Sequence, residues 1–173
     1  MAGSSLTSHE LTEWLKTCGT KLKSLNLEGN SNLTGEGLSI LLQDKLTNLE
    51  TLYLYVCRLT NQGWIDLLNM CGTNLKFLNL GGNKDLTGEG LSILKEKLIN
   101  LETLLLDRCP KLTNQGLTEV LQICGSKLKV LKITDNKDLT GEGLSFLQDK
   151  LINLETVYLY RCSHLLCKAL SEL

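Results

Sequence analysis

Three residues near the carboxyl end of this 173-residue chain have side chains that bind metals: Cys162, His164 and Cys167. Their spacing, C-x-H-x-x-C, brings three thiol and imidazole groups within six residues. A structural zinc site needs four ligands, commonly with paired C-x-x-C spacing, and this segment offers three. A metal site is therefore a remote interpretation, and we expect neither a metal nor a cofactor.

A second candidate for chemistry is the glycine-rich sequence T-G-E-G, which occurs three times. A phosphate-binding loop requires a lysine next to its glycines. Here the neighbours are Glu36, Glu89 and Glu142, whose carboxylates would repel a phosphate and favour the amino end of a helix. The chain has only two histidines, and no catalytic Ser/His/Asp or Cys/His set can be placed. We expect no enzyme, and leave a metal-binding or enzymatic protein as the remote alternative.

The strongest pattern in the chain is its internal repetition. LTGEGLS occurs at 33–39, 86–92 and 139–145, fifty-three residues apart, and LTNQG occurs at 59–63 and 112–116. Each long unit consists of two shorter repeats of 26 or 27 residues. A fixed period of this length is typical of a solenoid, in which every repeat position has a fixed place inside or outside the stack.

Each short repeat opens with the same apolar frame, L-x-x-L-x-L-x-x-N/C, which resembles the leucine-rich repeat. The six frames occupy 22–30, 49–57, 75–83, 101–109, 128–136 and 154–162. Repeat length, the cysteine at the ninth position and the L-T-x-x-G-L-x-x-L tail are similar to the cysteine-containing and ribonuclease-inhibitor-like subclass. That subclass includes F-box and NLR-type arrays. The resemblance implies an α/β fold, a right-handed leucine-rich-repeat solenoid with a parallel concave sheet and outer helices.

The residues alone predict the same elements. Alternation of leucine with other residues indicates a short strand with one buried face. The threonine hydroxyls that follow can cap a helix, at Thr34, Thr60, Thr87, Thr113 and Thr140. Two segments then place apolar residues on one helical face: Leu38, Leu41 and Leu42, and Leu117, Val120, Leu121 and Cys124. A helix between successive strands makes those strands parallel.

We predict a single domain over 1–173. It comprises a partial first repeat (1–21), five repeats (22–48, 49–74, 75–100, 101–127 and 128–153) and a truncated last one (154–173). Solenoids need polar caps, and the last helix carries Leu165, Leu166, Leu170 and Leu173. This apolar edge predicts either fraying of the last repeat or end-to-end self-association at high concentration. Trp14 and Trp64 align with the core positions Val120 and Leu117, so both are expected to pack inside.

Six of the seven cysteines have a structural interpretation. Cys57, Cys109 and Cys162 fall where the other repeats carry Asn30, Asn83 and Asn136. Buried asparagines there should bond the loop backbone of neighbouring repeats, and cysteine can fill the same site as a small, weakly polar group. Cys18, Cys71 and Cys124 end the apolar helical faces, whereas Cys167 has no periodic counterpart.

Composition narrows the partners and the compartment. A net charge of −1 gives no general attraction to nucleic acid or to an anionic membrane. No apolar run is long enough to cross a bilayer, and the polar first residues do not resemble a signal peptide. Reduced cysteines without a signal favour the cytoplasm, with the nucleus as the alternative.

The repeats differ mainly at the outward positions of the strands. We label the frame L-x2-x3-L-x5-L-x7-x8, in which x3, x5 and x7 share the face away from the helices. All four tyrosines occupy x5 or x7, and tyrosine is a common interface anchor, although it also favours strands. We predict that a protein or peptide ligand contacts ten residues on this concave face: Tyr53, Tyr55, Phe77, Leu105, Asp107, Arg108, Lys132, Tyr158, Tyr160 and Arg161.

The x2 column alternates in charge and predicts a structural row along the sheet. It reads Lys23, Glu50, Lys76, Glu102, Lys129 and Glu155. Adjacent parallel strands lie about 4.8 Å apart, so neighbouring repeats would pair opposite charges, and a slip by one repeat would oppose like charges.

The sequence thus predicts a protein-protein interaction module. The NLR-type resemblance suggests a role in immune recognition. The F-box resemblance gives the alternative, a substrate-receptor fragment of a ubiquitin ligase, but the 21 residues before the first frame are too few for an F-box and resemble half a repeat.

Overall fold

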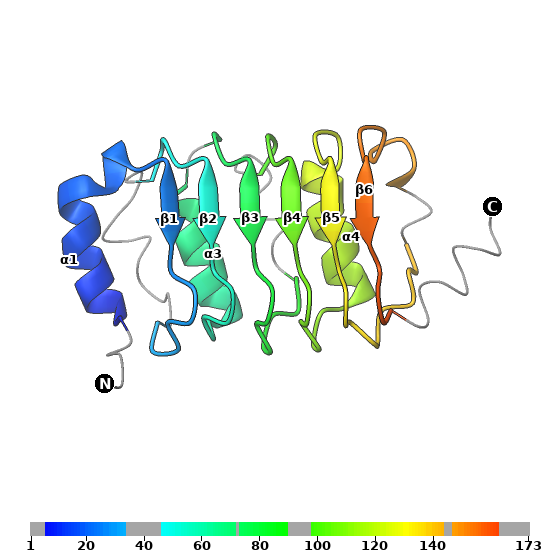
Figure 1. Cartoon of the computed structure of the whole chain (residues 1–173), viewed down its shortest axis with the longest axis horizontal. Coiled ribbons are helices and arrows are strands. Elements are labelled where there is room, and N and C mark those ends of the chain that lie inside the picture. Colours follow the sequence, from blue (N-terminus) through cyan, green and yellow to red (C-terminus); the bar gives the residue numbers. More distant parts are fainter. Residues whose placement is uncertain (1–5, 34–45, 72, 90–97, 144–146, 163–173) are drawn as a thin grey trace.

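The computed structural model describes residues 6–33, 46–71, 73–89, 98–143 and 147–162, and these form one stack of repeats. Six parallel strands make a single sheet in chain order, β1 to β6. Figure 1 shows α3 and α4 behind the sheet and α1 at its first edge. The predicted α/β solenoid with a parallel sheet and outer helices is therefore confirmed.

Each strand consists of the three residues x3 to x5 of one frame. The strands are β1 (Ser24–Asn26), β2 (Thr51–Tyr53), β3 (Phe77–Asn79), β4 (Thr103–Leu105), β5 (Val130–Lys132) and β6 (Thr156–Tyr158). Equivalent frame positions pair directly, so that Asn26, Tyr53 and Asn79 follow one another across the sheet. The columns read from the sequence are real neighbours in space.

Threonine caps begin the helices as expected. The helices are α1 (Ser8–Cys18), α3 (Asn61–Asn69) and α4 (Asn114–Cys124), and a short 3₁₀ turn, η1 (Gly19–Lys21), follows α1. The hydroxyls of Thr60 and Thr113 accept from the amides of Gly63 and Gly116, each at 3.0 Å. Thr7 adds a reciprocal capping box with Glu10. The predicted face of α4, from Leu117 to Cys124, is buried.

Buried leucines and a polar ladder hold the repeats together. Nδ2 of Asn83 donates to the Leu54 carbonyl of the preceding repeat at 2.9 Å, and its Oδ1 accepts from the Cys57 amide at 2.9 Å. Where cysteine replaces asparagine, the thiol makes the donor contact alone, as from Cys109 to Leu80 at 3.4 Å. The prediction that asparagine and cysteine share this buried position is confirmed.

The x8 position turns the chain into the left-handed region in all six repeats. Its residues are Gly29, Val56, Gly82, Arg108, Asp135 and Arg161, with φ between 56° and 74° in every case. Glycine tolerates this conformation and a β-branched residue does so poorly. Val56, with φ of 56°, is therefore the most strained of the six.

Tryptophan 14 corrects one expectation. Trp64 is fully buried, as predicted, but Trp14 is 51% exposed. α1 lies at the first edge of the sheet in Figure 1, with no described repeat packed on its other side. Repeat position alone does not bury a side chain, because burial also needs a neighbouring repeat on both sides.

Several predictions concern segments outside the described residues. These are the capping role of Thr34, the helical face of Leu38, Leu41 and Leu42, and the apolar edge of Leu165, Leu166, Leu170 and Leu173. His164 and Cys167 also lie there. Thr87 and Thr140 are described, and each hydroxyl accepts from the amide two residues later, Glu89 or Glu142.

Candidate functional site: the open face of the sheet

The candidate site is the sheet face opposite α3 and α4, here called the open face. It consists of the x3, x5 and x7 side chains together with the x8 rim at the carboxyl ends of the strands. All ten residues predicted to contact a partner lie at these positions, but their exposure differs. Tyr158 and Tyr160 are 50% and 69% exposed, whereas Tyr53 and Tyr55 are half-buried.

Tyr53 belongs to an aromatic pair rather than standing alone. Its ring centroid lies 4.9 Å from that of Phe77 on the next strand, with a tilted geometry. Such a cross-strand pair stabilises the sheet as well as offering an apolar surface. Leu105 follows in the x5 column and is also half-buried. The side chains of Tyr53 and Phe77 therefore have a structural role that the sequence pattern alone does not reveal.

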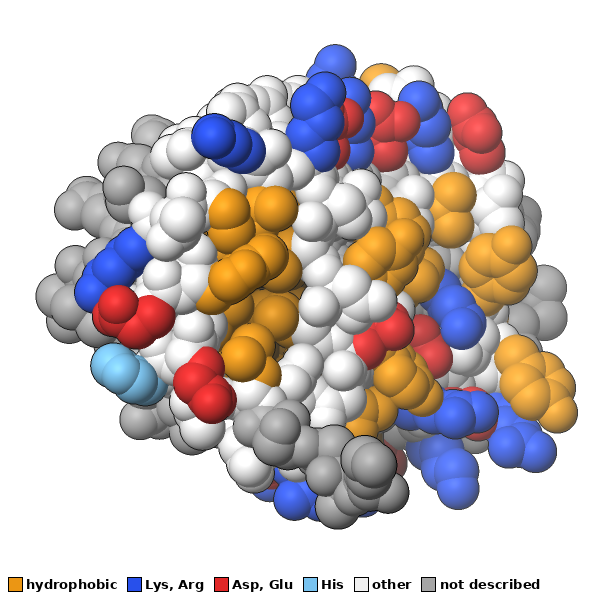
Figure 2. Space-filling model, turned by 60° about the vertical axis from the view of Figure 1, so that its left-hand side comes forward, with side chains coloured by type: hydrophobic (Ala, Val, Ile, Leu, Met, Phe, Trp, Pro, Cys, Tyr) orange, Lys and Arg blue, Asp and Glu red, His pale blue; other side chains and the backbone are white. Residues whose placement is uncertain are grey.

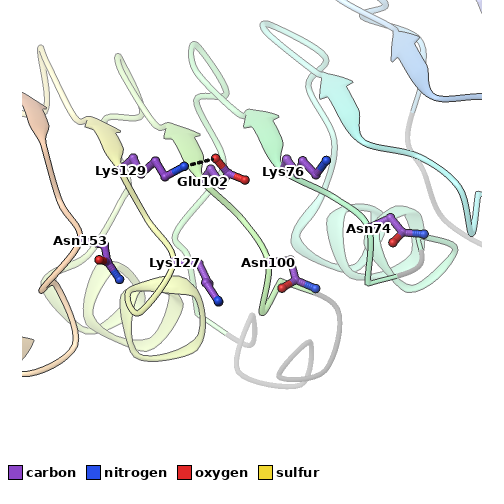
Figure 3. Close-up of a pocket in the computed structure, with 7 residues that line it drawn as sticks. All are labelled: Asn74, Lys76, Asn100, Glu102, Lys127, Lys129 and Asn153. Carbon is purple, nitrogen blue, oxygen red and sulfur yellow. Dashed lines mark hydrogen bonds and ion pairs between the residues drawn. The ribbon is translucent and has the colours of Figure 1, made fainter.

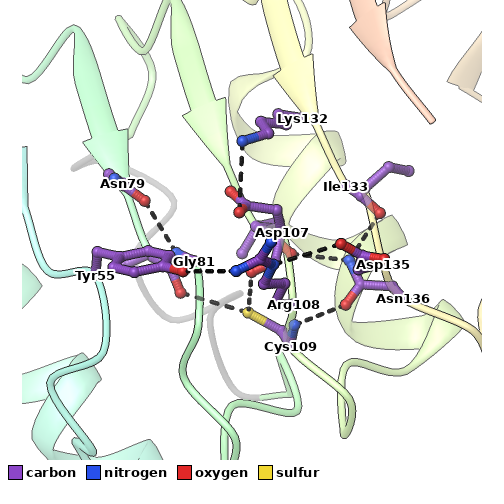
Figure 4. A network of polar contacts seen from close by, with 12 residues as sticks. Tyr55, Asn79, Gly81, Asp107, Arg108, Cys109, Lys132, Ile133, Asp135 and Asn136 are labelled. Carbon is purple, nitrogen blue, oxygen red and sulfur yellow. Dashed lines mark hydrogen bonds and ion pairs between the residues drawn. The ribbon is translucent and has the colours of Figure 1, made fainter. Parts of the chain in front are cut away.

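Gly82 of the third repeat leaves room for Tyr55 to reach Arg108. A Cβ atom on Gly82 would lie 3.2 Å from the Tyr55 ring and 2.6 Å from Val56, so only glycine leaves room for these side chains. Figure 4 shows the Tyr55 ring lying across the third repeat toward Arg108 of the fourth. The Arg108 guanidinium donates to the Tyr55 hydroxyl at 3.5 Å. This contact, with Asp135, raises the pKa of Arg108 above its ordinary value.

Asp135 joins two arginines on the rim. Arg108 Nε lies 3.4 Å from Asp135 Oδ2, and Arg161 lies 3.6 Å from Oδ1 of the same carboxylate. The Arg161 guanidinium carbon also lies 5.1 Å from the centroid of the Tyr160 ring. Tyr55, Arg108, Asp135, Arg161 and Tyr160 thus form an unbroken series of contacts, which we call the rim cluster.

Cations lie outside and carboxylates inside in this region. The side chains of Arg108 and Arg161 are 64% and 63% exposed, whereas that of Asp135 is 20% exposed. Asp107 is buried and contacts Lys132 at 3.4 Å. A partner approaching the rim cluster would therefore meet the arginine side chains before the Asp135 carboxylate.

Sequence reasoning missed three contributors to this site. Asp135 stood in the x8 column, but nothing indicated that it would bridge Arg108 and Arg161. Gly81 and Gly82 looked like turn residues, although a Cβ on Gly81 would lie 2.8 Å from Asp107 Oδ1. The signal available in the sequence was that one repeat, the third, has glycine at both x7 and x8.

The alternating charge row forms at the opposite end of the strands. Glu50 lies 3.6 Å from Lys23 and 3.2 Å from Lys76, and Glu102 lies 2.7 Å from Lys129. The hydrogen bond from Lys76 lowers the pKa of the Glu50 carboxyl, and that from Lys129 lowers the pKa of Glu102. Figure 2 shows such blue and red side chains alternating along the upper edge. The predicted pairing is confirmed for these neighbours.

A polar groove of about 360 Å³ accompanies this row (Figure 3). Its lining residues are Asn74, Lys76, Asn100, Glu102, Lys127, Lys129 and Asn153. The asparagines form a second ladder, because each donates to a carbonyl of the preceding repeat at 2.7–3.0 Å. Lys127 takes the asparagine position in one repeat and interrupts this ladder. The groove therefore follows from repeat stacking, with most of its polar groups already bonded.

The described residues show no group of metal-ligating side chains. Cys162 is buried, and its thiol donates to the Ile133 carbonyl at 2.9 Å. Burial raises the pKa of Cys57, Cys109 and Cys124 to about 12, so their thiols are poor metal ligands and nucleophiles. In the same part of the chain, no helix has the length and apolar character needed to cross a membrane.

Comparison with known proteins agrees with this geometry. A family model described as "Leucine Rich repeat" matches 20–41, 73–94 and 126–147. These three segments lie 53 residues apart, which is the long period of the sequence. These three segments are leucine-rich repeats. The matched segments contain strands β1, β3 and β5 of the solenoid.

Two solved structures match this chain to different degrees. The Rad7 and Elc1 complex of yeast contains a chain with 24% sequence identity and a TM-score of 0.61. The match covers 90% of this leucine-rich-repeat chain and 47% of that one. A second match, the actin-binding site 2 of leiomodin-1, has 14% identity and a TM-score of 0.47, covering 94% and 91% of the two chains. The first of these supports the fold.

One curated relative is also similar in sequence. The protein named "Putative RNA-binding protein EEED8.10" from Caenorhabditis elegans is 29% identical over 146 residues. That alignment covers 84% of this chain and 19% of the relative. The chain therefore spans about a fifth of the length of that protein.

Proposed function

We propose that this leucine-rich-repeat solenoid binds a protein or peptide ligand on its open face and acts by presenting a surface, not by catalysis. The observation that carries the proposal is where the repeats differ. Frame leucines, caps and ladder residues recur, whereas the x5, x7 and x8 positions vary and hold all four tyrosines. A purely structural array has no need for such variation on one face.

The character of the open face supports a protein partner over a small metabolite. Exposed Tyr158, Tyr160 and Arg161 lie together at its last strand. Tyrosine and arginine are enriched among residues that dominate binding energy in protein interfaces. Small ligands, in contrast, occupy concave and mainly apolar pockets, and the groove described above is polar and lies at the other end of the strands.

The compartment forms part of the same proposal. The ladder thiols of Cys57, Cys109 and Cys162 each donate to a backbone carbonyl of the preceding repeat, at 2.9–3.4 Å. These contacts require reduced thiols, which the cytoplasm or nucleus maintains. We propose that the protein works in the cytoplasm, with a role in immune recognition. The alternative is a role as substrate receptor in ubiquitin ligation. Either role would be carried out by a longer protein or an assembly that contains these repeats.

Affinity capture with the full chain tests the binding proposal. The informative variant is Tyr158→Ser/Tyr160→Ser, because both side chains are exposed and their removal leaves the buried core intact. Trp14→Ser is the matched control, since Trp14 is an equally exposed aromatic residue on α1, away from the open face. We expect proteins bound by the wild-type chain to be retained by Trp14→Ser and lost from the tyrosine variant. Retention by the tyrosine variant with loss from Trp14→Ser would refute the proposal.

A further inference from the structure

The rim cluster has unused hydrogen-bonding capacity that faces outward. Each arginine guanidinium carries five N–H donors. Among the described residues, Arg161 makes one long polar contact, to Asp135, and Arg108 contacts Asp135 and the Tyr55 hydroxyl at 3.4 and 3.5 Å. Neither arrangement is the bidentate pair that a guanidinium forms with a carboxylate at its best. Both arginines can therefore donate hydrogen bonds to a further carboxylate without breaking a strong contact.

We propose that the rim cluster selects an extended acidic segment of a partner protein, with two carboxylates placed at alternate residues. This inference rests on the proposed binding of a protein or peptide to the open face. It adds the chemical class of the partner: exposed cations above shielded carboxylates complement negative charge. Asp135 contacts both arginines, and its own side chain is only 20% exposed.

The spacing of the arginines gives the spacing of the acidic residues. Arg108 and Arg161 belong to repeats two strand spacings apart, about 10 Å. Their shared contact with the two oxygens of Asp135 draws the guanidinium groups closer than this. Alternate side chains of an extended peptide point to the same side and lie about 7 Å apart. An Asp or Glu at positions i and i+2 therefore matches the pair.

Aromatic side chains close the two ends of the cluster. Tyr55 lies beside Arg108, and Tyr160 lies beside Arg161. The residues flanking the acidic pair would pack against these rings, which offer apolar surface and one hydroxyl each. The recognised segment thus has the pattern of two carboxylates between apolar or aromatic neighbours.

A peptide is favoured over a nucleic acid by the charges of the whole face. Single-stranded nucleic acids bind a groove of cations that follows the backbone for several nucleotides. Here the carboxylates of Glu28, Asp107 and Asp135 lie at x7 and x8 among the cations, which interrupts such a path. Two adjacent arginines are enough for two carboxylates.

The test is selection from a random peptide display library on the full chain. The variant is Arg108→Gln/Arg161→Gln, which removes two exposed charges together with their ion pairs to Asp135. Lys16→Gln/Lys111→Gln is the control with the same charge change, because both lysines are exposed, belong to ion pairs outside the open face and pair at 2.6–2.7 Å. Urea unfolding of each variant checks the fold.

We expect wild type and the lysine control to enrich peptides with Asp or Glu at i and i+2. Binding of a synthetic enriched peptide should fall at least about tenfold in the arginine variant and weaken with salt. A different outcome is enrichment of peptides that lack acidic residues but lose binding to the Tyr158→Ser/Tyr160→Ser variant. That result would overturn this inference while still supporting the proposed binding of a ligand to the open face. Enrichment unaffected by either variant, or absent altogether, would overturn both proposals. Tighter arginine-dependent binding of labelled oligouridylate than of any acidic peptide would assign the cluster to RNA instead.

Discussion

The ladder residue Asn83 offers the sharpest test of how the repeats are joined. It is 1% exposed, and two buried backbone groups depend on it: the Leu54 carbonyl, to which Nδ2 donates, and the Cys57 amide, from which Oδ1 accepts. The Leu80 carbonyl keeps a second donor in Cys109 when Asn83 is replaced. Replacement by alanine therefore leaves two buried groups without a partner.

The magnitude follows from these two groups. An unpaired buried backbone group costs about 1–3 kcal/mol, so we expect Asn83→Ala to lower the free energy of unfolding by about 3 kcal/mol. Asn83→Cys restores a donor toward Leu54, as Cys109 does toward Leu80. It leaves the buried Cys57 amide unpaired, together with the more accessible Arg58 amide, which also donates to Asn83. Its expected cost is about half, roughly 1.5 kcal/mol.

Urea unfolding of the full chain, followed by far-ultraviolet circular dichroism, measures both values. Asn30→Ala is the matched control, because Asn30 has the same frame position but is only half-buried, so that water can replace its contacts. It should cost clearly less than Asn83→Ala. Equal losses for the alanine and cysteine variants at position 83, or a loss below about 1 kcal/mol for alanine, would show that the ladder bonds do not stabilise the stack as described.

Three further predictions concern charge, backbone strain and thiol reactivity. Lys76→Glu places a carboxylate between those of Glu50 and Glu102, and should lower the urea midpoint of unfolding at low salt. This loss of stability should fall by about half or more when salt screens the charge row. A loss that does not depend on salt would contradict an electrostatic origin. Val56→Asn should raise the free energy of unfolding by about 0.5 kcal/mol, because asparagine tolerates positive φ. Val56→Thr keeps the β-branch and should give no gain. Equal effects of the two substitutions in urea unfolding would exclude backbone strain as the cause. Burial raises the pKa of Cys124 to about 12, so its thiolate is scarce at pH 8. After iodoacetamide treatment, peptide mapping should find Cys124 unmodified in the folded chain and modified in urea. Modification without unfolding would refute its burial.

Repetition explains why so much of the fold could be predicted from the sequence. Each frame leucine, capping threonine and ladder asparagine acts within its own repeat or on the next one, so a fixed period transfers the same contacts along the stack. The strand register, the buried face of α4 and the alternating pairs of Glu50 and Glu102 all follow from this local rule. Eight of the ten residues predicted for the partner site were likewise placed on one face by the alternation of side chains along a strand, and the other two, Arg108 and Arg161, follow at x8.

Only the tertiary structure determines the contacts that skip a repeat or that depend on the neighbouring repeats. Tyr55 reaches Arg108 across a whole repeat, because Gly82 has no side chain to exclude the Tyr55 ring. Asp135 becomes the centre of the rim cluster because two arginines from either side converge on it. The sequence by itself determines which positions line the open face, through the period of the chain. Side-chain length, absent side chains and the edge of the stack then determine which of those residues touch and which stay exposed, and no single repeat contains that information.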